Sequence, residues 1–345
     1  MLRLSDFDFN LPPELIASRP LAQRDASRML VVNGGAVADK HIRDFLDYLQ
    51  PGDVVVFNNS RVIPARFIAD GKYEITLHTA TKDGCWWGLC KKFTKLKPGR
   101  LLTLEDGTMI GIVSQNIESG IKIKFLCDDV FATLERVGKM PLPPYMKREE
   151  ELADRDRYQT VYSQPLGSMA APTAGLHFTP ELLDEIRARG AKIVNITLHV
   201  GAGTWMPVKT EDLSQHKMHS EWGCITESQA EIINNATRVI AVGTTSMRLL
   251  ESAAKYNRAP AKYKRVSPFC RTTSIFITPG YKFRAVDILL TNFHLPKSTL
   301  FMLVSAFAGV NEMRAAYTHA ISQKYRFFSY GDCCLLFKKQ PEQGE

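Results

Sequence analysis

Ala-Ala-Pro-Thr-Ala-Gly-Leu-His-Phe-Thr (residues 170–179) and Leu-His-Val-Gly-Ala-Gly-Thr-Trp (residues 198–205) enclose the stretch of sequence that decides the fold. Thr179, followed by a proline, is typical of a helix start, because its hydroxyl accepts from a free amide and proline needs no N–H there. Apolar residues at helical spacing follow, and Gly190 predicts the end of this helix. Residues 193–198 are rich in β-forming side chains, so the second motif begins at the carboxyl end of a strand.

The same order of strand, small polar turn and helix recurs along the 345 residues. An apolar run at 239–242 precedes Gly-Thr-Thr-Ser-Met-Arg (243–248), and one at 285–290 precedes Thr-Asn-Phe-His-Leu-Pro (291–296). Residues 54–57 form a further strand of the buried type. This alternation predicts an α/β protein with a large mixed-sheet domain, whose ligands bind where strands end.

Residues 63–150 have a different rhythm. Turn pairs such as Asp-Gly and Pro-Gly recur there, and short segments such as 73–77 alternate between polar and apolar side chains. This pattern predicts a small antiparallel β-barrel domain inserted between the first part of the α/β domain, 1–62, and its second part, 151–345. The charge-dense residues 147–157 predict an exposed helix.

Composition narrows the class of protein. Lys and Arg number 44 against 36 acidic residues, and the net charge of +8 suits a polyanionic partner, although a modest surplus also suits an ordinary surface. Seven scattered cysteines without a CxxC pair argue against a disulfide framework or a zinc site, and predict a reduced, cytoplasmic protein. Acidic residues near the N-terminus do not fit a signal peptide, and the most apolar run, 300–310, is too short to cross a bilayer.

Four histidines lie in loop or strand-end motifs: His177, His199, His219 and His294. Imidazole is the usual proton carrier near neutral pH. A single loop histidine is more often a structural hydrogen bonder, but four in separate small-residue motifs favour a shared polar pocket. The spacing of His216 and His219 does not match a metal motif, so no metal site is predicted.

Residues 243–246 stand at a predicted helix start, with Arg248 close by. Free amides and hydroxyls there suit a carboxylate or phosphate, and simple helix capping is the alternative. Gly201 and Gly203 lack the third glycine of a dinucleotide fingerprint, and no phosphate-binding P-loop is present. A hydroxyl-assisted hydrolase or acyltransferase remains possible, but the G-x-S-x-G motif is missing.

Further motifs complete a pattern that spans nearly the whole chain. They are Phe-Asn-Asn-Ser-Arg-Val-Ile-Pro-Ala-Arg (57–66), Met-Pro-Leu-Pro-Pro-Tyr (140–145), Tyr-Gln-Thr-Val-Tyr (158–162), His-Lys-Met-His-Ser-Glu (216–221) and Arg-Phe-Phe-Ser-Tyr-Gly-Asp (326–332). Together with the motifs above, this colinear set resembles the S-adenosylmethionine:tRNA ribosyltransferase-isomerases of queuosine biosynthesis. Lys297, Trp205 and the pair Cys333 and Cys334 depart from the family's pattern.

The resemblance implies an enzyme that transfers and isomerises the ribosyl moiety of S-adenosylmethionine. The acceptor would be 7-aminomethyl-7-deazaguanine at the wobble position of tRNA, and the products epoxyqueuosine-tRNA, adenine and methionine. S-adenosylmethionine would serve as co-substrate, and neither a metal nor another cofactor would be required. The partners would be tRNA and S-adenosylmethionine, without a membrane, and the protein would be a monomer. The family's large α/β domain with an inserted barrel coincides with the predicted division.

Motif position assigns expected roles. The expected catalytic residues are His177, His199, His219 and Glu221. The expected substrate-binding residues are Asn58, Arg61, Thr173, Gly175, Gly201, Gly203, Thr204, Thr244, Thr245, Ser246, Arg248, Asn292, His294, Tyr330 and Asp332. Within this set, residues 244–248 are expected at the methionine carboxylate. The residues alone also leave open a non-catalytic RNA-binding or RNA-chaperone module, which would bind strongly without consuming a small molecule.

Overall fold

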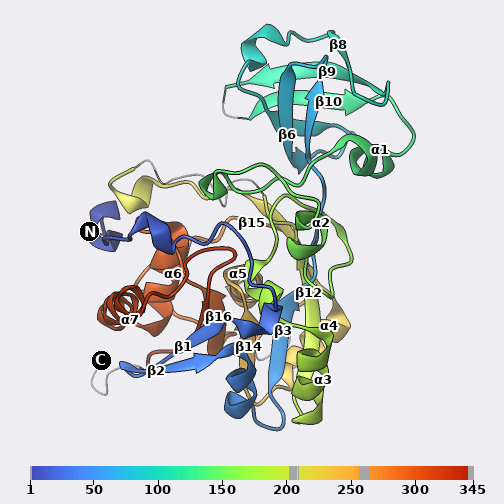
Figure 1. Cartoon of the computed structure of the whole chain (residues 1–345). Helices are drawn as coiled ribbons and strands as arrows, with labels where there is room; N and C mark the ends of the chain where they lie inside the picture. The colour runs from blue at the N-terminus through green and yellow to red at the C-terminus, as the bar shows by residue number, and fades with distance from the viewer. Residues whose placement is uncertain (1, 118, 202–207, 209, 256–264, 341–345) are drawn as a thin grey trace.

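The structure, a computed structural model, describes residues 2–117, 119–201, 208, 210–255 and 265–340. Within them, a large mixed sheet forms the body of the molecule (Figure 1). In spatial order its strands are β15 (Phe269–Thr273), β13 (Glu221–Ile225), β12 (Lys192–Leu198), β3 (Val54–Asn58), β14 (Val239–Val242), β16 (Ile288–Asn292), β17 (Cys333–Phe337), β1 (Arg28–Asn33) and β2 (Ala36–His41). The four central strands from β12 to β16 run parallel, as the alternating pattern predicted.

The central strand β3 shows why this sheet carries helices on both faces. All five of its residues are buried. Val54 and Val56 enter one core, whereas Val55 and Phe57 enter the core on the opposite face. Successive side chains of a strand point to opposite faces, so a continuous apolar run is stable only between two layers.

Helices cover these two faces. They are α3 (Pro180–Ala188), α4 (Glu227–Asn234), α5 (Thr244–Lys255), α6 (Thr299–Ala308) and α7 (Val310–Ser322). The helices α4, α5, α6 and α7 pack into the core on one face of the sheet, and α3 and the 3-10 helix η4 (Ile42–Tyr48) pack into the core on the other face. The predicted start of α3 is confirmed, because Thr179 Oγ1 accepts from Leu182 N, and Gly190 follows with φ of +80°.

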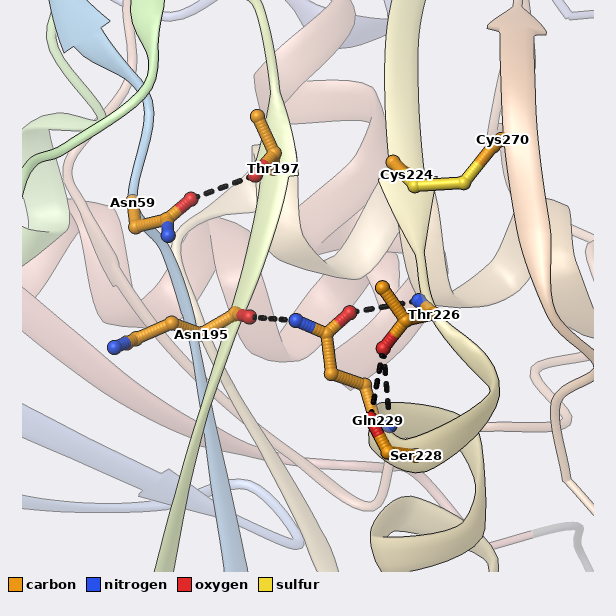
Figure 2. Close-up of a disulfide and its surroundings, with 8 residues drawn as sticks. All are labelled: Asn59, Asn195, Thr197, Cys224, Thr226, Ser228, Gln229 and Cys270. Atoms are coloured by element: carbon orange, nitrogen blue, oxygen red, sulfur yellow. Dashed lines mark hydrogen bonds between the residues drawn. A yellow bond between two sulfur atoms is a disulfide. The ribbon is translucent and has the colours of Figure 1, made fainter.

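A capping box starts α4. Thr226 Oγ1 accepts from Gln229 N at 3.3 Å, and Gln229 Oε1 accepts from Thr226 N at 2.8 Å. Gln229 Nε2 reaches further, to the carbonyl oxygen of Asn195 in β12 at 2.6 Å (Figure 2). The cap therefore also ties α4 to the sheet.

A second sheet is antiparallel and nearly closed. Its spatial order is β5 (Arg66–Ala69), β6 (Tyr73–Ala80), β7 (Trp86–Leu89), β10 (Gly120–Phe125), β9 (Met109–Asn116) and β8 (Leu101–Thr103). An antiparallel bridge between Ala69 and Leu104 joins the two ends. The barrel encloses its own apolar core, to which Leu134 of α1 (Val130–Val137) contributes. Figure 1 shows it projecting from one end of the large sheet. A short parallel pair, β4 (Arg61–Val62) and β11 (Leu166–Ser168), forms a third sheet.

That residues 63–150 fold as a separate unit stays a prediction. We expect limited proteolysis to cut first near residues 63 and 150, because no strand of the described residues belongs to both the large sheet and the barrel. Mass spectrometry of the fragments would identify the sites. First cuts inside the strands of the barrel would contradict the prediction.

The exposed helix expected over residues 147–157 is wrong in most of its length. Only α2 (Asp154–Arg157) is helical. Asp154 is buried and accepts from two nitrogens of Arg148 at 2.6 and 2.7 Å. The pair of Arg148 and Asp154 therefore lies inside the protein, whereas Lys147, Glu149, Glu151 and Asp156 are exposed, as the sequence pattern suggested.

The strand expected at 285–290 is displaced, because β16 is Ile288–Asn292. The amides of Ala285 and Val286 donate to the carboxylate of Glu251 in α5, at 3.0 and 3.2 Å, and so are not available to the ladder.

The expectation of fully reduced cysteines is wrong at one pair. Cys224 and Cys270 form a disulfide between β13 and β15 (Figure 2). They are direct partners in the antiparallel register, although 46 residues separate them in sequence. The spacing of the cysteines in the sequence does not indicate this disulfide, because only the pairing of the two strands brings the residues together. Separately, no helix within the described ranges is long and apolar enough to cross a membrane.

Candidate functional site

A pocket lies at the carboxyl ends of the central strands. Six of the sequence motifs meet there. The lining consists of Tyr158, residues 170–174, Val200, residues 243–245, residues 291–294, Leu300, Phe328 and Ser329. We call this concavity the main pocket. It lies where open α/β sheets tend to bind ligands, since β12, β14 and β16 all end at its wall.

The N-terminus of α5 lies at the main pocket and carries groups that suit an anion. Gly243 turns the chain at φ of +88°, directly after β14, and the first amides of α5 follow. Such amides lack partners within their own helix and carry the positive end of its dipole. Thr245 Oγ1 is buried and has no hydrogen-bond partner among the described residues. Ser246 differs, because its hydroxyl donates to the carbonyl oxygen of Val242 at 2.8 Å.

Phe328 forms an aromatic side of the pocket in an unusual backbone conformation. Its φ is +74°, which non-glycine residues rarely adopt. Three contacts hold it: its amide donates to Phe293 O at 3.1 Å, its carbonyl accepts from Asn292 Nδ2 at 2.8 Å, and its ring meets Tyr145 edge-on. Strain of this kind concentrates at functional sites. The exposed part of the ring suits stacking on a planar base.

His177 is fully engaged by its neighbours. Asn292 donates through Nδ2 to two carbonyls, so its Oδ1 accepts from His177 Nε2 at 3.1 Å. His177 Nδ1 then accepts from Ser27 Oγ at 2.9 Å. Burial lowers the pKa of His177 to about 4. Neither ring nitrogen has a free lone pair, so the ring holds Asn292 in place at the pocket wall.

His294 lines the main pocket as a neutral ring. Its Nε2 lies 3.2 Å from Thr291 Oγ1, and its amide donates to Tyr317 Oη at 2.9 Å. Burial lowers the pKa of His294 to about 3.

His199 stands at the end of β12 beside Val200, which lines the pocket. Its Nδ1 lies 2.7 Å from Ser60 Oγ, and the ring stacks on Trp222 with centroids 5.3 Å apart. A side chain at Gly167 would meet the ring at 2.9 Å, so glycine is required there. Burial lowers the pKa of His199.

Two serines fix this ring from behind. Ser168 Oγ accepts from Val200 N at 2.9 Å and donates to Ser60 Oγ at 2.7 Å. Ser60 Oγ can donate to His199 Nδ1 or, in the tautomer with a proton on Nδ1, accept from it through its second lone pair. In that tautomer Nε2 carries the lone pair that a base needs. Ser60 lies in the motif at 57–66, but nothing in the sequence indicated Ser168.

Glu221 and Arg248 form a buried ion pair, with exposed side-chain fractions of 6% and 7%. The other carboxylate oxygen of Glu221 accepts from Gly201 N at 3.0 Å. Arg248 Nη2 is buried without a partner among the described residues. Glu221 therefore neutralises the predicted carboxylate anchor and holds the start of the loop after β12.

The remaining predicted site residues divide into three groups. Thr173, Thr244, Thr245, Asn292 and His294 line the main pocket. Six others lie outside its lining. Asn58 hydrogen-bonds to Leu198 in β12, a side chain at Gly175 would meet Tyr162, Asp332 accepts from the amides of Arg28 and Arg326, and Tyr330 donates to Asp154. Arg61 and His219 are exposed. Gly203 and Thr204 lie outside the described residues. Within the described ranges, no three His, Cys, Asp or Glu side chains gather as a metal site.

His177 and His294 make stability depend on pH. Their folded pKa values of about 4 and about 3 lie below the roughly 6.5 of an exposed histidine, so the unfolded chain binds protons more readily. Their contribution is complete above about pH 6.5 and is lost as the pH falls toward 4. At pH 5 we expect a loss on the order of 2 kcal/mol per histidine.

Urea unfolding at pH 7.5 and pH 5 would measure this effect. His294→Gln should weaken the pH dependence, whereas the matched control His219→Gln, at an exposed position, should leave it unchanged. An equal pH dependence in parent and His294→Gln would contradict the expectation.

Fold and site together define an α/β protein whose sheet edge forms a polar pocket with an anion-receiving helix start and an aromatic wall. A family model described as "Queuosine biosynthesis protein" matches residues 4–336, and the chain belongs to this family. A relative from Rhodospirillum rubrum, called S-adenosylmethionine:tRNA ribosyltransferase-isomerase, is 49% identical over 97% of this chain and 98% of its own length. One of the same name from Caulobacter vibrioides is 47% identical over 98% of this chain and all of its own.

A solved structure shows the same similarity. It is that of an S-adenosylmethionine tRNA ribosyltransferase from Thermotoga maritima, which is 31% identical with a TM-score of 0.55. The match covers 96% of this chain and 99% of the other.

Proposed function

We propose that this protein is the S-adenosylmethionine:tRNA ribosyltransferase-isomerase of queuosine biosynthesis. It transfers the ribosyl moiety of S-adenosylmethionine to 7-aminomethyl-7-deazaguanine at the tRNA wobble position, and it releases adenine and methionine. The observation that carries the proposal is the main pocket, in which six motifs from distant parts of this family member's chain meet. The enzyme acts in the cytoplasm, where its tRNA is found, and as a monomer.

The start of α5 receives the methionine carboxylate. The free amides of its first turn and the unpartnered Thr245 hydroxyl supply the hydrogen bonds, and the helix dipole favours the negative charge. Arg248 supports this site indirectly, because its charge is already matched by Glu221.

His199 exchanges protons with the substrate. The positive sulfur of S-adenosylmethionine acidifies the adjoining ribose carbon, so a base must remove a proton there before adenine leaves. Among the predicted histidines, His199 has one nitrogen oriented by Ser60 and leaves Nε2 for the substrate. His177 has both nitrogens engaged and positions Asn292 for contacts with the ribose or the base. The aminomethyl nitrogen of the acceptor base must reach the ribose while the pocket excludes water.

The test is incubation of the protein with S-adenosylmethionine and tRNA that carries the precursor base. Nucleoside mass spectrometry should detect epoxyqueuosine, and adenine and methionine should appear in equal amounts. Tight tRNA binding without consumption of S-adenosylmethionine would favour a non-catalytic RNA-binding protein and would overturn the proposal.

A further inference from the structure

A second concavity adjoins the main pocket. Ser329 lines both of them, and the bonded pair of His177 and Asn292 stands between them. Arg24 and Arg157 contribute its charge, and Ser27 and Tyr330 contribute hydroxyl groups. We call this concavity the arginine pocket. None of the steps described above uses it.

The positive charge of the arginine pocket is not neutralised. Within the described residues, neither Arg24 nor Arg157 forms an ion pair with a carboxylate. Their guanidinium groups donate to backbone carbonyls instead: Arg24 to Leu176 and Asp156, and Arg157 to Leu21 and Ala22. Burial and the neighbouring Arg157 both lower the pKa of Arg24. Asp156 is near enough to raise the pKa of Arg24, but it forms no ion pair with it, and two adjacent guanidinium groups without an ion-paired acid suit an anion.

Unused donors point the same way. Arg157 Nε and Arg326 Nη1 are buried and have no hydrogen-bond partner among the described residues. Arg24 and Arg326 both lower the pKa of His177, whose ring lines this pocket, whereas Asp332 raises it. A buried charged donor without a partner is costly, and a bound anion would supply the missing acceptor.

We propose that the arginine pocket binds a phosphodiester group of the tRNA strand, next to the nucleotide whose base enters the main pocket. The inference rests on the proposed function, because it takes the RNA as substrate. Guanidinium groups match the geometry of phosphate oxygens, and the shared wall at Ser329 places the phosphate beside the reacting nucleotide. The contact fixes the register of the strand and carries no sequence information.

Arg157→Gln tests the proposal, with Arg157→Lys as the variant that keeps the charge. The matched control is Arg187→Gln, which removes an exposed arginine on α3. Dissociation constants for the precursor tRNA and for S-adenosylmethionine are measured separately, at several salt concentrations. We expect Arg157→Gln to weaken tRNA binding about tenfold and to reduce the salt slope by about 1. Arg157→Lys, which keeps the charge but not the planar fork, should lose less affinity than Arg157→Gln, and the control should stay within about threefold of the parent.

Each outcome decides one claim. Unchanged tRNA affinity in Arg157→Gln, with an unchanged melting temperature, overturns the arginine pocket, as does an equal loss in Arg187→Gln. Weaker binding of S-adenosylmethionine instead of tRNA assigns the pocket to the donor and also overturns it. If Arg157→Gln does not fold, Arg24→Gln takes its place in the same assays. A parent that binds tRNA but produces no adenine refutes the proposed function alone, and a parent that binds no tRNA refutes both.

Discussion

His199→Ala is expected to slow turnover between about a hundredfold and ten-thousandfold, the usual cost of losing a general acid or base. The alanine removes the imidazole ring that Ser60 orients and that stacks on Trp222. No group is then left at this position to exchange a proton with the substrate. Single-turnover release of adenine at saturating S-adenosylmethionine isolates this step. The affinity for both substrates should change by no more than a few-fold, since proton transfer is a transition-state contribution.

Two further variants separate chemistry from support. Ser60→Ala keeps the imidazole but releases Nδ1, so we expect a smaller rate loss together with a shifted pH profile. His219→Ala is the control for histidine removal as such, because that side chain is exposed and lies outside the main pocket. If His199→Ala turned over within a few-fold of the parent while folded, the proton-transfer role would have to pass to another group.

The fold was predictable from sequence where a local pattern of residues, such as an apolar run or a helix cap, determines the structure. The apolar run of β3, the cap at Thr179 and the helix start at Gly243 are local features, and the structure has them as expected. The disulfide between Cys224 and Cys270 was not predictable, because it depends on the pairing of two strands far apart in sequence.

The site shows the same division. Thr244, Asn292 and His294 line one pocket, since parallel strands bring their carboxyl ends together, and their roles there stay predictions. Motif position could not show that both ring nitrogens of His177 are hydrogen-bonded within the protein, or that Arg248 forms a buried ion pair with Glu221. Sequence spacing indicates which residues reach the sheet edge, whereas their hydrogen bonds decide what each of them can still do there.

The ion pair of Arg248 and Glu221 is expected to give the largest effect on stability. Arg248→Met leaves the Glu221 carboxylate buried, with the amide of Gly201 as its remaining hydrogen-bond donor among the described residues. Breaking a buried pair by removing one partner typically costs about 3–5 kcal/mol, because the remaining charge is uncompensated. Urea unfolding at pH 7.5 should show this loss in the free energy of unfolding.

The double variant Arg248→Met with Glu221→Gln should recover most of that stability, because the glutamine is neutral and keeps an oxygen for Gly201 N. This variant also decides what Arg248 does for the substrate. If the start of α5 anchors the methionine carboxylate, S-adenosylmethionine should bind the stable double variant within a few-fold of the parent. A tenfold or greater loss of donor affinity at restored stability would show that the guanidinium itself contacts the carboxylate, through the Nη2 that has no partner among the described residues.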